Sequence, residues 1–257
     1  MNNLEANNNL YAGLDVGSRT TKLVVYNGAV CETQIIPTGV TPLERCRELL
    51  NGRIFQRLVV TGYGRHLVAP VLGAEVITEI KAFAAGARYL VPECHTVIDV
   101  GGQDSKVILL TDKGDIQKFE MNDRCAAGTG KFLEIMASTL EVNIADFGRL
   151  AMDSAKVIRI NSLCTVFAES EVVSLIAKGE EPAAIAFALH DAIATRLAAM
   201  IRRTGVREKV VFAGGGSYNL CLRRLLEQEL ETRLTVPESP QAVGALGAAL
   251  IAADGII

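Results

Sequence analysis

The sequence lacks three features, and each absence argues against a class of protein. It has no uninterrupted apolar run of about 18 residues, the length that a membrane-spanning helix needs. Its formal net charge of −3 provides no positive surface for nucleic acid or for an anionic membrane. Its six cysteines include no Cys-x-x-Cys pair, and scattered cysteines in a cytosolic chain are more often buried thiols or metal ligands than disulfides.

Length and composition indicate a globular protein. The 257 residues allow one large domain or two domains of about 100 to 150 residues. A hydrophobic share of 49% with 21% charged residues is ordinary for a chain that buries a good core. The segment Met1–Asn9 is polar and rich in Asn, unlike a signal peptide. We therefore expect a soluble cytoplasmic protein with neither a nucleic acid nor a membrane as its partner.

One pattern occurs twice in the chain. Asp15-Val-Gly-Ser-Arg-Thr-Thr-Lys22 aligns with Asp99-Val-Gly-Gly-Gln-Asp-Ser-Lys106, and Asp, Val, Gly and Lys are identical. An apolar run precedes each copy, a β-rich run follows it, and a second turn comes next, which is the pattern of a β-hairpin. Two hairpins of one design predict two related half-domains, and the repeat favours two domains over one.

A glycine turn between two strands suits phosphate binding. It lets the backbone approach a ligand closely, and its free N–H groups form an anion-binding concavity. An Asp just before the turn suits hydrated Mg²⁺, which takes one or two carboxylates together with phosphate oxygens. Two such turns facing each other would hold a nucleoside polyphosphate. The alternative is that both are ordinary Asp-Val-Gly hairpin turns, which the duplication with aspartates in register makes less favourable.

Strands and helices alternate along the rest of the chain, as is typical of an α/β protein. The loop at 61–65 contains two glycines, and we predict an ordinary strand-to-helix turn there rather than part of a ligand site. Further strands are expected at 31–36, 58–60, 76–77, 116–120, 210–213 and 232–236. Helices are expected at 41–50, 79–90, 130–140, 165–178, 182–203, 217–231 and 241–253.

The triple glycine Gly214, Gly215 and Gly216 is a second nucleotide signal. It lies between an apolar strand and a helix, where small residues let a flat adenine or ribose lie against the backbone. The helix start would add free N–H groups. The pattern is not a dinucleotide fingerprint, because its sixth position is Asn219 rather than glycine or alanine.

Two cysteines share a local pattern. Asn122 stands three residues before Cys125, and Asn161 stands three residues before Cys164. Asn is a preferred N-cap, so we expect both thiols in or near the first turn of a helix, where the dipole favours thiolate and lowers the pKa. The alternative is two small buried residues. One chain supplies two of the four ligands of a cubane iron–sulfur cluster, and a two-fold dimer would supply the others.

At the duplicated turns the chain resembles the superfamily of actin, sugar kinases and heat-shock chaperone ATPases. This resemblance implies an α/β fold of two duplicated ribonuclease-H-like domains with ATP in the cleft between them. The first domain would comprise residues 1–95 plus about 241–257, and the second residues 96–240. Gly214, Gly215 and Gly216 fall where that superfamily has its adenosine-binding motif.

A narrower resemblance comes from three blocks, which begin at Ile98, Asn122 and Cys164 and run to Lys106, Gly130 and Glu171. They are similar to the signatures of the 2-hydroxyacyl-CoA dehydratase activators, which group with the ATPase subunits of benzoyl-CoA reductase. The resemblance implies a homodimer with one 4Fe–4S cluster, held by Cys125 and Cys164 of each subunit. Cys31, Cys46, Cys94 and Cys221 match no ligand of the family and are interpreted as structural.

The resemblance also implies an activity and residue roles. ATP hydrolysis to ADP would drive an electron into an iron–sulfur acceptor enzyme, a dehydratase or a related double-cubane or benzoyl-CoA-type reductase, with ferredoxin or flavodoxin as donor. Asp15 and Asp99 would hold Mg²⁺ through water. Lys22 and Lys106 would contact phosphate or be solvated strand residues. Gln103 and Asp104 would orient the attacking water, and the phosphates would lie against Gly17, Ser18, Thr20, Gly101 and Gly102.

Two other functions are compatible with the same fold. An amino-sugar kinase would need a base and a pocket for an acceptor hydroxyl, and it would have no use for paired cysteines. A chaperone-like or scaffold ATPase would need a client-binding domain, for which the chain leaves little room.

Overall fold

The computed structural model describes residues 10–161 and 164–254. The described residues form two compact units. The first contains the chain up to Glu93, Asp112–Ile116 and the residues from Gln241 onward. The second contains Cys94–Thr111 and Gln117–Pro240.

A five-stranded sheet in the order β3-β2-β1-β4-β5 forms the centre of the first unit. Strands β1, β2 and β3 are antiparallel neighbours, whereas β4 and β5 run parallel to β1. Side chains of a strand point alternately to the two faces, and both faces are covered here. The strands are β1 (Tyr11–Val16), β2 (Thr20–Tyr26), β3 (Val30–Pro37), β4 (Arg57–Thr61) and β5 (Glu75–Val76).

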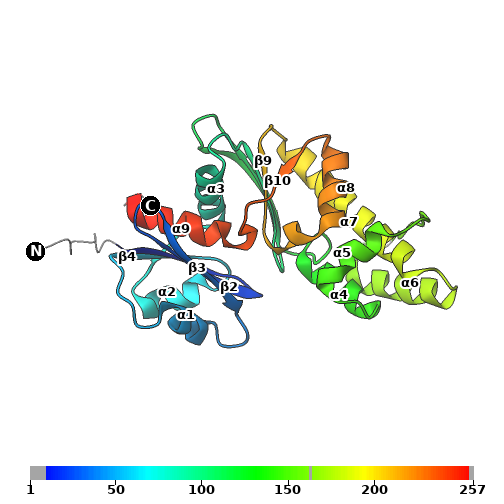
Figure 1. Ribbon diagram of the computed structural model, residues 1–257, viewed down its shortest axis with the longest axis horizontal. Coiled ribbons are helices and arrows are strands. Elements are labelled where there is room, and N and C mark those ends of the chain that lie inside the picture. The colour runs from blue at the N-terminus through cyan, green and yellow to red at the C-terminus, as the bar shows by residue number, and fades with distance from the viewer. Residues whose placement is uncertain (1–9, 162–163, 255–257) are drawn as a thin grey trace, which may run out of the picture. The chain divides into compact units, whose positions relative to one another are not determined.

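Helices cover both faces of this sheet (Figure 1). On one face α1 (Pro42–Leu50) and α2 (Arg65–Leu72) pack on the buried side chains of Leu14, Val16 and Leu23. On the other face α9 (Val243–Asp254) packs on β1, β2 and β4, and α3 (Glu79–Leu90) packs along α9. Small residues permit that contact, because a β-carbon at Gly247 would lie 1.7 Å from the carbonyl oxygen of Ala82.

The second unit has a sheet of the same design, in the order β10-β9-β6-β7-β8. Strands β6 and β7 form the antiparallel hairpin, and β9 runs parallel to β6, as β4 does to β1. The strands are β6 (Thr96–Val100), β7 (Ser105–Leu110), β8 (Ile116–Asn122), β9 (Val210–Ala213) and β10 (Leu234–Thr235).

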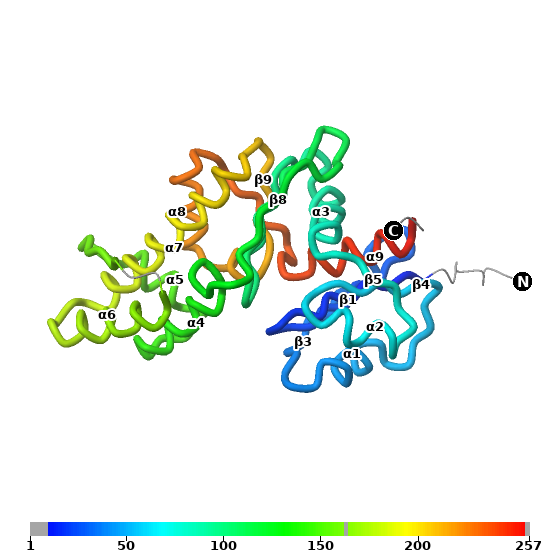
Figure 2. Tube along the Cα trace, turned by 180° about the vertical axis from the view of Figure 1, so that it is seen from behind, coloured from blue at the N-terminus to red at the C-terminus, as the bar shows by residue number. Residues whose placement is uncertain are grey.

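Helices of the second unit enclose its main core. Ile98, Val100 and Phe212 of the sheet pack in one cluster with residues of the helices. Figures 1 and 2 both place α6 at the end of this unit farthest from β9. The helices are α4 (Gly130–Thr139), α5 (Ile144–Met152), α6 (Thr165–Ala177), α7 (Pro182–Thr204) and α8 (Leu220–Leu230).

Helix α7 is the one helix in the described residues that is long and apolar enough to cross a membrane. Two-thirds of its most apolar window (67%) is buried inside the protein, where Ile185, Leu189 and Leu197 belong to the core of the second unit. Core helices of soluble proteins pass the same test of length and composition, so α7 is weak evidence for a membrane span.

The two five-stranded sheets confirm the predicted α/β fold class and both predicted hairpins. Helix α5 was not predicted, and α2 is the helix that the predicted strand-to-helix turn at 61–65 implies without giving its bounds. Helix α5 had a usable signal, since Asn143 precedes Ile144 and its side chain accepts a hydrogen bond from the N–H of Ala145. The predicted helix from Ser217 is wrong at its start: a 3₁₀ turn occupies Gly215–Tyr218, and α8 begins at Leu220.

Candidate functional site

The first glycine turn is held in place by its own unit. Asp15 and Lys22 are cross-strand partners in the β1–β2 hairpin, and Lys22 Nζ lies 3.0 Å from Asp15 Oδ2. The N–H of Gly17 donates to the carbonyl of Thr20 at 3.1 Å, and the hydroxyl of Thr38 donates to the carbonyl of Gly17 at 2.8 Å. The turn between Asp15 and Thr20 is therefore fixed before any ligand binds.

The second turn repeats this arrangement. Asp99 and Lys106 are partners in the β6–β7 hairpin, and Lys106 Nζ lies 2.9 Å from Asp99 Oδ2 and 2.8 Å from Asp104 Oδ1. Lys106 is only 1% exposed. The alternative that this lysine is a solvated strand residue is wrong, because it lies in a buried ion pair. The same alternative fails for Lys22, whose side chain is 12% exposed and paired with Asp15.

No contact in the structure tests the roles that were predicted for Gln103 and Asp104 at the second turn. These roles stay predictions. Gln103 is exposed, whereas Asp104 is half-buried and paired with Lys106. The N–H of Gly101 donates to the carbonyl of Asp104 at 2.9 Å, which closes the turn. Gly102, like Gly101, is partly exposed.

The triple glycine contacts the second turn directly. Gly214 has φ +79°, and a β-carbon there would lie 2.3 Å from Asp99 Oδ1 and 2.4 Å from the carbonyl oxygen of Val100. A β-carbon at Gly216 would lie 2.5 Å from Val100 Cγ1. Only glycine allows this approach, since φ is in the left-handed region and no side chain fits. The structure thus brings Gly214 and Gly216 to Asp99 and its neighbour, within one unit.

The first unit contains an equivalent loop that the sequence did not reveal. Gly62 has φ +91°, and a β-carbon there would lie 2.5 Å from Asp15 Oδ1. A β-carbon at Gly64 would lie 2.6 Å from Val16 Cγ1. As at Gly214 and Gly216, the first glycine lies against the aspartate and the second against the valine that follows it. The interpretation of 61–65 as an ordinary strand-to-helix turn is incomplete, because the loop also packs against Asp15.

A buried histidine supports the segment after the triple glycine. His190 Nδ1 lies 2.7 Å from the carbonyl oxygen of Ala186, and its Nε2 lies 2.8 Å from Asn219 Nδ2. Since the amide donates, Nε2 accepts and Nδ1–H donates to the carbonyl. The Asn219 side-chain oxygen accepts from the N–H of Leu222, which caps α8. Burial lowers the pKa of His190 from 6.5 to about 4.

This pKa predicts an acid-sensitive contribution to stability. Between pH 6.5 and pH 4 the unfolded chain binds a proton at His190 that the folded chain does not, so stability falls as pH falls. From pH 7 to pH 5 the free energy of unfolding should drop by roughly 2 kcal/mol from this group. Urea denaturation at both pH values checks this. His190→Gln should lack that share of the pH dependence, and equal pH dependence in both proteins would contradict the assignment.

The two candidate cluster ligands differ in their settings. Cys164 is exposed and is the N-cap of α6, as predicted for a thiol at a helix start. Cys125 is half-buried and lies in a loop, because α4 begins only at Gly130. The predicted helix start at Cys125 is wrong: Asn122 ends β8 and caps no helix. The side-chain amide of Asn122 donates to the carbonyl oxygens of Cys125, at 2.9 Å, and Ala127, at 3.0 Å.

Asn161 is not an N-cap either. Its backbone N–H donates to the Glu171 carboxylate at 3.1 Å, and the cap of α6 is Cys164 itself. Ser162 and Leu163, which complete the predicted Asn-to-Cys pattern, lie outside the described residues. Three other cysteines, Cys46, Cys94 and Cys221, are buried, and Cys31 is exposed on β3. Burial raises the pKa of the Cys46 and Cys221 thiols to about 11.

The second turn is bonded to the helix that follows Cys125. The N–H groups of Gly130 and Lys131, at the start of α4, donate to the carbonyl oxygens of Gly101 and Gly102, both at 2.8 Å. Between Cys125 and α4, the backbone N–H of Thr129 donates to the carbonyl of Ala126 at 2.9 Å. A displacement of the second turn would therefore move the start of α4 and the segment that carries Cys125.

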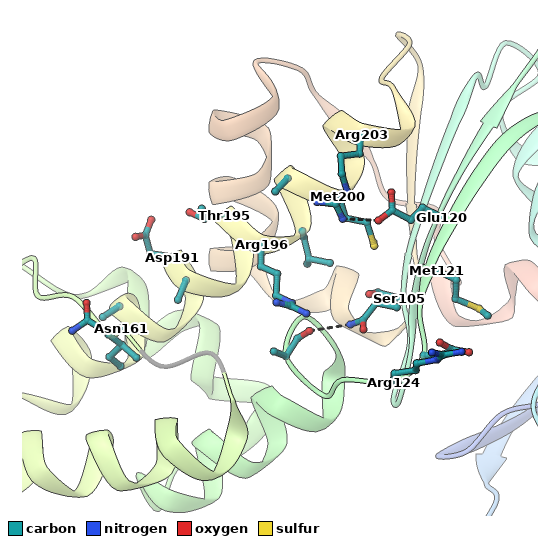
Figure 3. A pocket seen from close by; sticks show the side chains of 18 of the residues that line it. Ser105, Glu120, Met121, Arg124, Asn161, Asp191, Thr195, Arg196, Met200 and Arg203 are labelled. Atoms are coloured by element: carbon teal, nitrogen blue, oxygen red, sulfur yellow. Dashed lines mark hydrogen bonds and ion pairs between the residues drawn. The ribbon is translucent and has the colours of Figure 1, made fainter.

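A cavity of 940 Å³ adjoins the Cys125 segment (Figure 3). It lies between the end of β8 with the residues after it and one side of α7, and Asn122 is part of its lining. In Figure 3, Arg196 extends from α7 toward the loop beside Ser105, whereas Asp191 points away from it. Arg203 pairs with Glu120 at 2.5 Å. The cavity has no local signal in the sequence, because its lining comes from four separate segments, at 105, 120–127, 159–161 and 188–203.

The comparisons with known proteins identify the family. Residues 12–252 match the BadF/BadG/BcrA/BcrD ATPase family. The chain belongs to this family. It is 40% identical over 252 residues to the 2-hydroxyisocaproyl-CoA dehydratase activator of Clostridioides difficile, covering 94% of each chain. It is 38% identical over 250 residues to the (R)-2-hydroxyglutaryl-CoA dehydratase activating ATPase of Acidaminococcus fermentans, covering 93% of this chain and 95% of the relative.

A solved structure extends the likeness to three dimensions. The activator of the 2-hydroxyisocaproyl-CoA dehydratase from Clostridium difficile, with bound ADPNP, superposes with a TM-score of 0.88 at 38% identity. The superposition covers 96% of this chain and 95% of that structure. Membership of this ATPase family confirms the predicted ATPase and the predicted actin-like fold. The individual site residues stay predictions.

The residues of this ATPase fit the groups that the family resemblance implies. Asp15 and Asp99 are buried carboxylates at the entrances to glycine turns, the chemistry that hydrated Mg²⁺ requires. Neither the Cys125 nor the Cys164 sulfur makes a hydrogen bond within the described part of the chain. No group of three or more His, Cys, Asp or Glu in the residues described is arranged to hold a metal ion. The Cys125 and Cys164 thiols of one chain would fit a cluster whose other two ligands come from a second copy.

Proposed function

We propose that this ATPase is an activator that couples ATP hydrolysis to the transfer of one electron to an iron–sulfur acceptor enzyme. The observation that carries the proposal is the pair of hydrogen bonds from Gly130 and Lys131 to the second glycine turn. These bonds connect a turn suited to phosphate with the segment of Cys125, so a nucleotide bound at this turn would be linked to a thiol of the same chain. The names of the relatives, which are activators of dehydratases, support the same proposal.

Cys125 and Cys164 of two copies would hold one 4Fe–4S cluster, which would supply the low-potential electron. The protein would then act as a homodimer in the cytoplasm, with ferredoxin or flavodoxin as the donor. The acceptor would be an enzyme of the 2-hydroxyacyl-CoA dehydratase type or a related double-cubane or benzoyl-CoA-type reductase. Support comes from the accessibility of both thiols, because Cys164 is exposed and Cys125 is half-buried.

In the nucleotide site, Asp15 and Asp99 would hold Mg²⁺ through water. The turn residues would bind the phosphates, and the Gly214–Gly216 segment would lie against the adenosine. Lys22 and Lys106 each already bind one oxygen of the nearby aspartate. A bound Mg²⁺ would compete with these ammonium groups for the carboxylates, and each lysine would then be available to a phosphate oxygen. Gln103 and Asp104 would orient the attacking water.

Coupling requires that ATP and ADP bind two conformations with different affinity, since a ligand that binds both equally shifts nothing. A short series of hydrogen bonds would transmit such a conformational change from the second turn to the Cys125 segment. A shift of the Gly101 and Gly102 carbonyls would displace the N-terminus of α4, and Asn122 would carry the movement to the Cys125 carbonyl. The surroundings of the cluster would change with the nucleotide.

The experiment that tests the proposal measures iron, acid-labile sulfide, the visible spectrum and ATP hydrolysis on protein purified without oxygen. We expect about four irons per dimer, as for one cubane cluster. Absence of iron from folded, ATP-hydrolysing protein prepared in this way would contradict the electron-transfer function. Phosphorylation of an added amino sugar by that metal-free protein would favour a kinase instead.

A further inference from the structure

One buried hydroxyl group beside Asp15 has no hydrogen-bond partner among the described residues. Thr61 is the last residue of β4, and its side chain is fully buried at 0% exposure. Its Oγ1 makes no hydrogen bond with any residue that the structure describes. Leaving a buried hydroxyl unbonded destabilises a folded protein, and native proteins rarely keep such a group without a water, an ion or a ligand to bind.

The duplicated unit shows that the fold does not need this hydroxyl. Thr61 pairs with Asp15 across β4 and β1, and Ala213 pairs with Asp99 across β9 and β6. Each residue precedes the glycine loop that contacts the aspartate. At the equivalent end of β9 in the second unit, the side chain is the methyl group of Ala213. The hydroxyl is therefore an addition specific to the first unit, at a position where alanine suffices for packing.

The Thr61 hydroxyl also lies next to the Asp15 carboxylate, which we assign to hydrated Mg²⁺. Directly paired residues of neighbouring parallel strands point to the same face of the sheet, and the strands are about 4.8 Å apart. The left-handed backbone at Gly62 keeps the loop against Asp15 Oδ1, while Lys22 holds Oδ2. Asp15 is itself 4% exposed, so its carboxylate and the Thr61 hydroxyl are buried together.

We propose that Thr61 is a positioning residue of the ATPase site, whose hydroxyl bonds a water of the hydrated Mg²⁺ held by Asp15. The inference rests on the proposed function only in its ATP-hydrolysis part and is independent of the iron–sulfur cluster. It assigns unequal roles to the two aspartates, because Asp99 has Ala213 in place of a hydroxyl.

The test compares Thr61→Val with Thr61→Ser in the whole protein. Valine keeps the shape and removes the hydroxyl, so kcat for ATP hydrolysis should fall about tenfold or more, the effect of one hydrogen bond to a charged group. KM for ATP should change little, and the Mg²⁺ concentration for half-maximal rate should rise. Serine should restore both. Mn²⁺ titration by electron paramagnetic resonance, with a non-hydrolysable ATP analogue present, should show weaker Mn²⁺ binding in the valine variant alone.

Stability separates this role from a structural one. Because the hydroxyl has no partner, Thr61→Val should unfold at or above the wild-type urea midpoint. Thr21→Val should unfold at a lower urea concentration, because Thr21 Oγ1 lies 2.9 Å from Thr38 Oγ1.

Two results would overturn the assignment: wild-type kcat and Mn²⁺ affinity in Thr61→Val, or a loss of stability like that of Thr21→Val. Failure of the proposed function has different signatures: wild-type protein would hydrolyse no ATP if its ATPase part failed, and would hydrolyse ATP without containing iron if its electron-transfer part failed.

Discussion

Replacement of Cys125 or Cys164 by serine should remove the iron of the protein. Either change leaves a cluster between two copies with two thiolates in place of four, because each copy loses the same ligand. We expect iron to fall from about four per dimer to below about one, and the visible absorption to disappear. Purification without oxygen followed by iron and sulfide analysis measures this directly.

The two variants should differ in their effect on the protein itself. Cys164 is exposed, so its loss costs no packing, whereas Cys125 is half-buried and contacts the core of the second unit. Cys31→Ser is the matched control, because Cys31 is an exposed thiol on β3 of the first unit. It should keep its full iron content. Full iron in Cys125→Ser and Cys164→Ser would contradict the ligand assignment, and iron loss in Cys31→Ser would indicate a different set of thiols.

Local sequence patterns predicted the hairpins because each is a local structure. Apolar alternation on both sides of a glycine turn determines the strands, and the turn length then sets the register. That register makes Asp15 face Lys22 and Asp99 face Lys106, so the ion pairs follow from the hairpins themselves. Spacing alone leaves phosphate and solvent open for each lysine, because it does not show which residue faces the lysine across the hairpin.

The role of the 61–64 loop could not be predicted in the same way. Its contact with Asp15 requires β4 to lie parallel and next to β1, and the two strands are separated by β2, β3 and α1 in the chain. The likeness to the triple glycine is hidden because Tyr63 occupies the position of Gly215. At Cys125 the error was local: Asn favours helix caps, but here its amide bonds two carbonyl groups of an irregular loop.

Replacement of Asp99 by Asn should abolish ATP hydrolysis and leave the iron content intact. Asparagine has the shape of aspartate and no charge, so it cannot supply the carboxylate that we assign to hydrated Mg²⁺. We expect kcat to fall by about a hundredfold or more, comparable to the loss of one preorganised electrostatic contact in an active site. Cys125 and Cys164 keep their own surroundings, so an iron assay on the same preparation should match wild type. A fully active variant would contradict the assignment.

A buried lysine makes the control for this variant essential. Lys106 is 1% exposed and bonds both Asp99 and Asp104, so Asp99→Asn leaves its ammonium group with one carboxylate instead of two. Some loss of stability is expected from the lost partner. Asp104 still pairs with Lys106 in the variant, so the loss should be modest, and urea denaturation should find the protein folded under the conditions of the assay. A folded variant that hydrolyses no ATP supports the assignment of Asp99 to Mg²⁺. Activity that falls only in proportion to the folded fraction would contradict it.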